Sequence, residues 1–545
     1  MTDPADLVLT GVRIHGADDP AVDSLAVRGD RILAVGPAAD VRDRVGPGAE
    51  TRHLPGGLVV PGFQDAHVHP PQAGRNRLTV DLDGLTGVEA YVAAVAQYAS
   101  AHPEAEWVTG GGWAMEHFPG GTPTRELLDA VVPDRPVFLF NRDVHGAWVN
   151  SVALARAGID RVTPDPPDGR IERDPVSGEP TGTLHEGAAY TLSDRLVPPP
   201  TAADWDEAIL AAQAQLHAYG ITGWQDAWVT PDTQAAYQRL AASGRLTARV
   251  VGALWWERER GVEQIPDLLA RRGSTSHATV SGIGFHPTSV KIMLDGVLEN
   301  FTGAMLEPYC DGHGGHGSQR GLTYLDPDVH RRAVVELDRL GFQVHHHAIG
   351  DRANRMALDA IEAARRANPD VDNRHHIAHI QVVQPADLPR FAELGVVANA
   401  QAYWAQSEPQ MDTLTIPFLG PKRAELQYPF AGLLRAGARL AMGSDWPVTT
   451  ANPLEQIEVA VTRVDPEHRD NGPFLPAERL SVGQAVDAFT AGSAFVNHDA
   501  DAGRLSPGRR ADLAVLDRDI RAIPGREIAD ASVVLTLSAG RVVHG

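Results

Sequence analysis

Short apolar runs separated by glycine, aspartate and proline occupy both ends of the chain. They cover residues 7–9, 13–14, 25–27 and 31–35 near the start, and 512–516, 532–537 and 541–543 near the end. Runs of this length between turn residues are typical of β-strands. We therefore predict that residues 1–60 and 500–545 pair into one composite β domain, with the central segment looped out between them.

The middle of the chain alternates strand-like runs with helical patterns. The strand-like runs cover residues 248–254, 289–293, 342–345, 376–380, 396–399 and 439–442. Residues 328–340 and the stretch after Asp351 place apolar side chains at helical spacing. This alternation predicts a parallel α/β fold, and a (β/α)8 TIM barrel over residues 61–74 and 206–499 is the best fit.

Residues 75–205 break the alternation and are predicted to form an insertion subdomain after the first barrel strand. They contain the glycine run 110–112 and proline-rich stretches at 164–167 and 198–200. We interpret the glycine run as a backbone turn. It lacks the strand–helix context and the lysine of a phosphate-binding loop, which argues against a nucleotide site.

Composition limits the classes of partner. The chain has 545 residues, of which 43% are hydrophobic and 22% charged, as in ordinary globular proteins. Its formal net charge of −22 argues against nucleic-acid binding, and no apolar stretch is long enough to cross a bilayer. Cys310 is the only cysteine, so no intrachain disulfide can form and a reducing cytoplasm is the expected location.

Two histidines two residues apart introduce the candidate chemistry. His67 and His69 follow the apolar run 58–63, and on a strand their side chains point to one face, so both imidazoles can bind one metal ion. Further metal-competent or base-competent side chains lie near the ends of later strands: Lys291, His347, His379 and Asp445. Because barrel active sites are built where strands end, these six side chains are predicted to converge on one mouth.

Each of these residues also has a structural interpretation when taken alone. A single histidine among 23 is more often a hydrogen-bonded core or surface residue, and an aspartate often caps a loop. The neighbouring histidines are interpreted in this way, and we expect none of them to bind metal: His345, His346, His375 and His376. It is the complete set of six that favours a metal site.

Longer motifs around these positions resemble the amidohydrolase superfamily, in particular its amidohydrolase family 3 branch, which includes N-substituted formamide deformylases. The matching segments are residues 61–69, 290–300, 347–353, 375–381 and 443–448, with terminal matches at 29–32, 503–505, 508 and 511–513. The resemblance spans nearly the whole chain. It implies a distorted (β/α)8 barrel and a β-sandwich made from both termini.

The resemblance also implies a binuclear metal centre. His67 and His69 would bind one ion, and His347 and His379 the second. Two zinc ions are expected, with manganese and iron as alternatives, because imidazole and carboxylate ligands suit these metals. The chain departs from the expected pattern at Ala378, where relatives are expected to carry glutamate before the histidine.

Three further roles follow from the same resemblance. Carboxylation of Lys291 by CO₂ would give a carbamate that bridges the two ions, whereas an unmodified lysine would leave a mononuclear site. Asp445 would complete the first site and act as the general base that passes a proton to the departing nitrogen. His145 would bind substrate or stabilise the oxyanion, with a structural role in the insertion as the alternative.

Aromatic residues near the predicted ligands indicate the kind of substrate. Apolar, partly aromatic cavities are typical of small-molecule sites, and we predict that Trp113, Trp404 and Trp446 bind the substrate. Trp224, Trp228 and Tyr403 lie in similar positions. We expect hydrolysis of a C–N bond in a small-molecule amide, specifically an N-substituted formamide giving formate and an amine. We also expect a homodimer that binds neither nucleic acid nor membrane.

Other functions stay open at this point. A cyclic-amide hydrolase, an N-acyl amino acid hydrolase or a deaminase would use the same centre. An N-acyl amino acid would need a cation for its carboxylate, and Arg142 and Arg352 are the candidates. Outside catalysis, the alternative is an inactive binding protein of the same fold, which the filled ligand positions disfavour.

Overall fold

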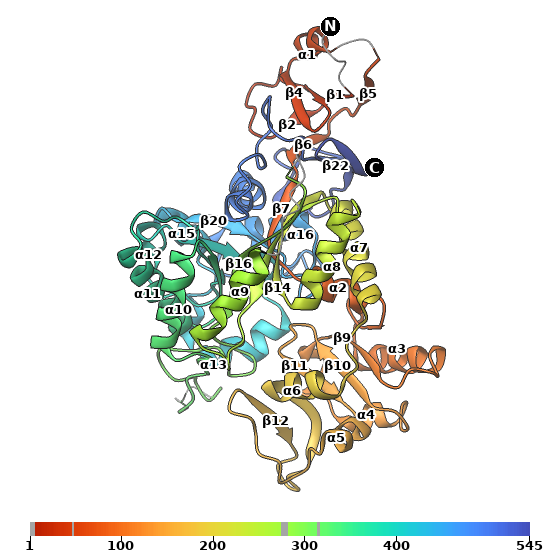
Figure 1. Cartoon of the computed structure of the whole chain (residues 1–545), viewed down its shortest axis with the longest axis vertical. Helices are drawn as coiled ribbons and strands as arrows, with labels where there is room; N and C mark the ends of the chain where they lie inside the picture. Colours follow the sequence, from red (N-terminus) through yellow and green to blue (C-terminus); the bar gives the residue numbers. More distant parts are fainter. Residues whose placement is uncertain (1–5, 46–47, 274–281, 313–314, 316) are drawn as a thin grey trace.

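Eight parallel strands form the centre of the protein. The computed structural model describes residues 6–45, 48–273, 282–312, 315 and 317–545. The sheet follows chain order from β7 to β20, and every neighbouring pair is parallel (Figure 1). Its strands are β7 (Phe63–Val68), β14 (Ile221–Val229), β15 (Arg249–Trp255), β16 (Gly284–Met293), β17 (Gln343–Ala348), β18 (His376–His379), β19 (Val397–Ala400) and β20 (Arg439–Met442).

The barrel closes where the loop after β20 meets β7. The Asp445 N–H donates to the His67 carbonyl at 2.7 Å, and the His69 N–H donates to the Trp446 carbonyl at 2.9 Å. Gly443 permits this approach, because a Cβ there would lie 2.5 Å from the His67 backbone nitrogen. Closure therefore brings the first and last predicted ligand segments together.

Helices cover the outside of the barrel, as the amphipathic patterns predict. The helix predicted at 328–340 is α10, which begins after Asp326; the Asp326 carboxylate accepts the backbone N–H groups of Asp328 and Val329. The helix predicted after Asp351 is α11, and its buried face matches the apolar spacing. The covering helices include α2 (Pro70–Asn76), α7 (Ala202–Ala218), α8 (Pro231–Ala242), α9 (Ile265–Gly273), α10 (Pro327–Arg339), α11 (Asp351–Ala367), α12 (Leu388–Glu393), α15 (Phe430–Arg435) and α16 (Pro453–Thr462).

Strands from both ends of the chain share one sheet. The N-terminal β6 pairs antiparallel with the C-terminal β21, with Val59 opposite Val515. This sheet has the order β2–β6–β21–β22–β23, and a second sheet has the order β4–β3–β1–β5. Both termini lie at this end of the molecule (Figure 1). The strands are β1 (Leu7–Thr10), β2 (Arg13–Ile14), β3 (Ser24–Arg28), β4 (Arg31–Gly36), β5 (Glu50–His53), β6 (Leu58–Pro61), β21 (Leu513–Leu516), β22 (Val533–Ser538) and β23 (Arg541–His544).

The segment between β7 and β14 contains its own six-stranded sheet, at the opposite end of the molecule from the termini (Figure 1). The strands are β8 (Val80–Asp81), β9 (Val108–Trp113), β10 (Val137–Asn141), β11 (Gly146–Val149), β12 (Gly169–Arg173) and β13 (Pro180–Glu186), and the helices are α3 (Val88–Ala101), α4 (Arg125–Asp129), α5 (Ser151–Ala157) and α6 (Gly187–Leu196). The prediction of a turn at residues 110–112 is wrong, because these glycines lie in β9. They allow close strand contact: a Cβ at Gly110 would lie 2.1 Å from the Val80 carbonyl oxygen.

Among the described residues, no helix combines the length and the apolar character that crossing a membrane requires.

Candidate metal centre

All six predicted ligands line one cavity of about 730 Å³. His67 lies in β7, with His69 directly after it, and Lys291 lies in β16. His347 lies in β17 and His379 ends β18, whereas Asp445 follows β20. The insertion contributes further walls, including Phe138, Phe140 and His145. The cavity therefore lies at the carboxyl ends of the barrel strands, where barrel active sites are built.

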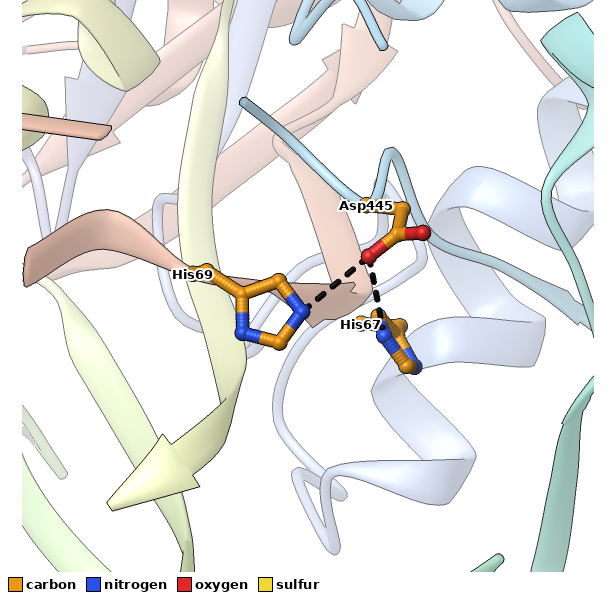
Figure 2. Close-up of side chains that lie close together, drawn as sticks. All are labelled: His67, His69 and Asp445. Atoms are coloured by element: carbon orange, nitrogen blue, oxygen red, sulfur yellow. Dashed lines mark hydrogen bonds and ion pairs between the residues drawn. The ribbon is translucent and has the colours of Figure 1, made fainter. Parts of the chain in front are cut away.

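One carboxylate joins the first pair of histidines. The Nε2 atoms of His67 and His69 each lie 3.1 Å from Asp445 Oδ1, and Figure 2 shows both imidazoles directed at this oxygen. Ligand atoms of the three residues all lie within 4.8 Å of one another. Two imidazole nitrogens and a carboxylate oxygen are a donor set that zinc and similar divalent metals accept.

The second pair of histidines lies beside the first. The rings of His347 and His379 have centroids 4.4 Å apart, and the His379 and His67 centroids are 4.8 Å apart. Within the described part of the chain, the Nδ1 atoms of His69, His347 and His379 are buried without a hydrogen-bond partner. His347 Nδ1 lies 3.3 Å from Asp295 Oδ1, but outside hydrogen-bond geometry. The unpaired buried nitrogens of His347 and His379 fit a bound cation, whereas His69 presents its Nε2 to Asp445 instead of its Nδ1.

Burial keeps His67, His347 and His379 neutral. It lowers the pKa of His67 to about 3, and it holds the pKa values of His347 and His379 well below their ordinary value. Burial alone would raise the pKa of Asp445, but contacts with His67 and His69 hold that pKa well below its usual range. Neutral imidazoles beside an ionised carboxylate are the protonation states that bind a metal.

Lys291 is buried at the end of β16 and lines the same cavity. Burial lowers the pKa of its amine to about 7, against the attraction of Asp445 and Asp226. A buried ammonium beside bound cations would be strongly unfavourable, so the site favours a lysine that has lost its positive charge.

The backbone is strained at two of the candidate ligands. Asp445 has φ 59° and His379 has φ 76°, in the left-handed region that most side chains avoid. Such conformations cost about 1–3 kcal/mol each and persist only where surrounding contacts hold them. Here the Asp445 N–H bonds to the His67 carbonyl, and the His379 N–H donates to Gln401 Oε1 at 2.7 Å. The strain is located at the side chains that face the proposed metals.

His145 reaches the cavity from the insertion, with a carboxylate behind it. Its Nδ1 lies 3.0 Å from both oxygens of the fully buried Glu186, which also accepts the Thr302 hydroxyl at 2.8 Å. Burial opposes the charge on His145, but Glu186 and Asp143 raise its pKa to about 9. The His145 ring centroid is 5.6 Å from that of His347. Sequence reasoning missed Glu186, because no local motif links it to a histidine 41 residues earlier.

Only one of the three predicted substrate-binding tryptophans lines the cavity. Trp404 does so, whereas Trp113 is buried in the core of the insertion and its Nε1 donates to the Leu139 carbonyl at 2.9 Å. Trp446 is buried in the barrel core. Trp113 and Trp446 are therefore corrected to core residues, since each side chain is taken up by packing. The cavity has other aromatic walls: Trp205, Trp228 and Trp255.

A parallel barrel with histidines, a lysine and an aspartate at its strand ends can hold a metal ion that activates water for hydrolysis. A profile of the amidohydrolase family matches residues 50–544. The chain therefore belongs to the amidohydrolase family.

Individual relatives match over nearly their full length. The protein LONG AFTER FAR-RED 3 of Arabidopsis thaliana is 33% identical over 558 residues, covering 99% of this chain and 92% of its own. The N-substituted formamide deformylase of Arthrobacter pascens is 29% identical over 554 residues, covering 99% of this chain and 98% of its own. The crystal structure of an uncharacterized metal-dependent hydrolase from Pyrococcus furiosus has a TM-score of 0.70 at 28% identity and covers 94% of this chain and 99% of its own.

Family membership and the cavity agree on the class of reaction. The chain is a metal-dependent hydrolase that acts on carbon–nitrogen bonds.

Proposed function

We propose that the protein hydrolyses an N-substituted formamide to formate and an amine. The observation that carries this proposal is the convergence of six metal-competent side chains in one cavity with aromatic walls. A volume of about 730 Å³ suits a small molecule. The indoles of Trp228, Trp255 and Trp404 offer apolar surface to the N-substituent. The similarity to the Arthrobacter pascens deformylase over both full chains supports the same substrate class.

The centre is proposed to hold two divalent ions, zinc first, with manganese or iron as alternatives. His67, His69 and Asp445 would hold one ion, and His347 and His379 the other. Lys291 would bridge them after its Nζ bonds to the carbon of CO₂ and releases a proton. A bound divalent metal supplies a water nucleophile at neutral pH and polarises the carbonyl.

The protein's own side chains are proposed to move the proton and stabilise charge. Asp445 takes the proton of the attacking water and passes it to the departing nitrogen, which leaves as an amine. His145, kept protonated by Glu186, donates a hydrogen bond to the oxygen that gains negative charge. The aromatic walls hold the N-substituent and exclude water from it.

A substrate panel tests the formamide proposal. Metal-loaded protein is assayed against N-benzylformamide and analogues, N-acyl amino acids, cyclic amides and aminopurines. We expect formate and amine from the formamides at the highest kcat/KM. If no formamide is cleaved but another amide is hydrolysed, the formamide proposal is rejected, while the assignment as a C–N hydrolase stands.

The N-acyl amino acid alternative cannot use the two arginines predicted for it. Arg142 Nη1 is paired with Glu116 at 3.2 Å, and its Nη2 donates to Gln410 at 2.9 Å. Neither Arg142 nor Arg352 is among the residues that line the described cavity. Arg258 does line it, but is paired with Asp168 at 3.1 Å. Arg75 lines it as well, with its guanidinium 6.0 Å from the centroid of the Trp205 ring, so a substrate carboxylate could meet this cation without displacing the Arg258–Asp168 pair.

We also propose that the protein is a homodimer of the reducing cytoplasm, a location that its single cysteine supports. Light scattering on a sizing column would give twice the chain mass of 58.4 kDa for a dimer. The chain mass alone would reject the dimer.

A further inference from the structure

The barrel interior below the candidate metal centre is polar. Barrel interiors are ordinarily filled by branched apolar side chains. Here five polar residues inside the barrel are at most 2% exposed: Gln225, Gln343, His345, His376 and Asn399. Their side chains form a connected hydrogen-bond network that ends at a candidate metal ligand. Burial of so many polar groups is tolerated only where each has a partner.

The network reaches the metal centre through His345. His67 Nδ1 lies 2.8 Å from His345 Nε2, and His345 Nδ1 lies 2.7 Å from Gln225 Oε1. Each neutral imidazole carries one N–H and one lone pair. The donor–acceptor direction of one hydrogen bond in this series therefore fixes the direction of the next.

Gln343, deeper in the barrel, fixes the direction of these hydrogen bonds. Gln343 Nε2 donates to the backbone carbonyls of Arg374 at 2.9 Å and Val496 at 2.8 Å. Carbonyls only accept, so the other side-chain atom of Gln343, Oε1, is an acceptor. It receives Gln225 Nε2 at 2.9 Å. Gln225 Oε1 is therefore an acceptor too, and His345 Nδ1 must carry the hydrogen.

A second path fixes the same direction independently. Asn399 Nδ2 donates to the Ala66 carbonyl at 2.9 Å and lies 3.2 Å from His376 Nδ1. His376 Nδ1 is therefore the lone pair, so its Nε2 carries the hydrogen and donates to Gln225 Oε1 at 2.9 Å. Both paths assign Gln225 Oε1 as the acceptor for two imidazole N–H groups.

We propose that Gln225, acting through His345, fixes the tautomer of His67 so that Nε2 always presents a lone pair to the metal. With its hydrogen on Nδ1, His345 has its lone pair on Nε2, and His67 must donate from Nδ1. His67 Nε2 then faces Asp445 Oδ1 at 3.1 Å with a lone pair against a carboxylate oxygen. Two acceptors at that distance fit joint binding of one metal ion. The inference rests on the proposed metal centre and adds positioning residues to it.

His69 shows the contrast. Its Nδ1 is buried with no hydrogen-bond partner in the described part of the structure. The protein therefore orients only His67 of this pair through a relay. Residues that orient a ligating histidine typically change metal affinity 10–100-fold when they are replaced.

Variants of His345 test the relay through metal affinity. Zinc dissociation constants are measured on chelator-treated protein by competition with a chromophoric chelator. His345→Leu removes the acceptor for His67 Nδ1 and is expected to weaken zinc binding about 10–100-fold. His345→Gln retains an acceptor oxygen and is expected to stay within a few-fold of the wild-type chain.

A neighbouring histidine pair supplies the control. His346 follows His345 on β17, and its side chain points out of the barrel toward helix α10. There its Nε2 lies 3.1 Å from the Nε2 of His330. His330→Leu also disrupts a buried histidine pair, but it leaves the relay intact. We expect its zinc affinity to equal that of the wild-type chain.

Gln225 provides a second test if His345→Leu does not fold. Gln225→Met keeps the volume and removes the acceptor, and it is expected to weaken zinc binding. Wild-type affinity in His345→Leu or in Gln225→Met, or equal losses in His345→Leu and His330→Leu, would overturn the relay. A wild-type chain that binds no zinc, manganese or iron would instead overturn the metal centre itself.

Discussion

Asp445 contacts both histidines of the first pair through a single oxygen, and the proposed proton transfer depends on it. Asparagine at this position keeps the size but cannot accept the proton. We expect Asp445→Asn to lower kcat by about 10²–10⁴-fold, the range for general acid–base catalysis. Most of the metal should stay bound through the histidines, as measured by elemental analysis of the variant.

The control for this variant is another aspartate of the same cavity. Asp232 lines the cavity, is exposed and contacts none of the proposed ligands. Asp232→Asn should turn over at close to the wild-type rate. An Asp445→Asn enzyme with wild-type kcat would refute the role of Asp445 as base.

Glu186 is expected to act through His145. Glu186→Gln removes the negative charge that keeps the imidazole protonated, so stabilisation of the oxyanion weakens. We expect kcat to fall at least about 10-fold with metal content unchanged. The matched control is Glu172→Gln, which disrupts a similar pair with His185 at 3.2 Å away from the cavity. Equal kcat in Glu186→Gln and the wild-type enzyme would remove His145 from the mechanism.

Some of the strands that position the site can be predicted from the sequence and others cannot. Strands such as β17, with a short apolar run before its histidines, could be predicted, and so could convergence of their end residues on one mouth. Strand β14 could not, because the buried polar residues Gln225 and Asp226 break its apolar run. The glycines of β9 are a related case. A run of glycines is typical of a turn, but here glycine is needed because β9 lies very close to β8.

The partners of His145 and His67 could not be predicted because they lie far away in the sequence. Glu186 lies 41 residues from His145, and His345 lies 278 residues from His67. No local spacing reveals such partners, because only the folded barrel brings them together. Trp113 and Trp446 failed for the opposite reason. Trp446 is next to Asp445 in the sequence and Trp113 ends a strand, yet both indoles pack into a core.

The segment after β19 contacts the insertion through charged residues that respond to pH. Burial raises the pKa of Glu408 to about 7, although Arg142 lies nearby. Because this pKa is above the unfolded value, ionisation of Glu408 lowers stability as pH rises from about 4.5 to about 7. Glu408→Gln cannot ionise. We therefore expect its Tm, relative to that of the wild-type chain, to increase between pH 5 and pH 8, as measured by differential scanning fluorimetry.

The exposed Glu425 supplies the comparison for Glu408. Glu425→Gln changes an exposed side chain and is measured over the same pH range to control for the substitution itself. A Tm difference for Glu408→Gln that is constant or falls across this pH range would contradict the assigned sign.

The whole molecule depends on pairing between its two ends. Val515 in β21 is fully buried, opposite Val59 of β6. An unpaired charge at this position costs about 3–5 kcal/mol, so Val515→Asp should lower Tm sharply or prevent soluble expression. Val534→Asp on the neighbouring strand β22 is the control, because Val534 is 38% exposed. Equal thermal stability of the two variants would show that the termini do not hold each other in place.

One cavity between the barrel and its insertion is proposed to hold the metal-dependent centre for C–N hydrolysis. The most direct measurement follows bound metal and amide hydrolysis in the same preparation as metal is removed by a chelator and then restored. We predict that hydrolysis falls to background with the last bound metal and returns on addition of zinc, manganese or iron. Full activity in metal-free protein, or no hydrolysis of any C–N bond by fully loaded protein, would contradict this account.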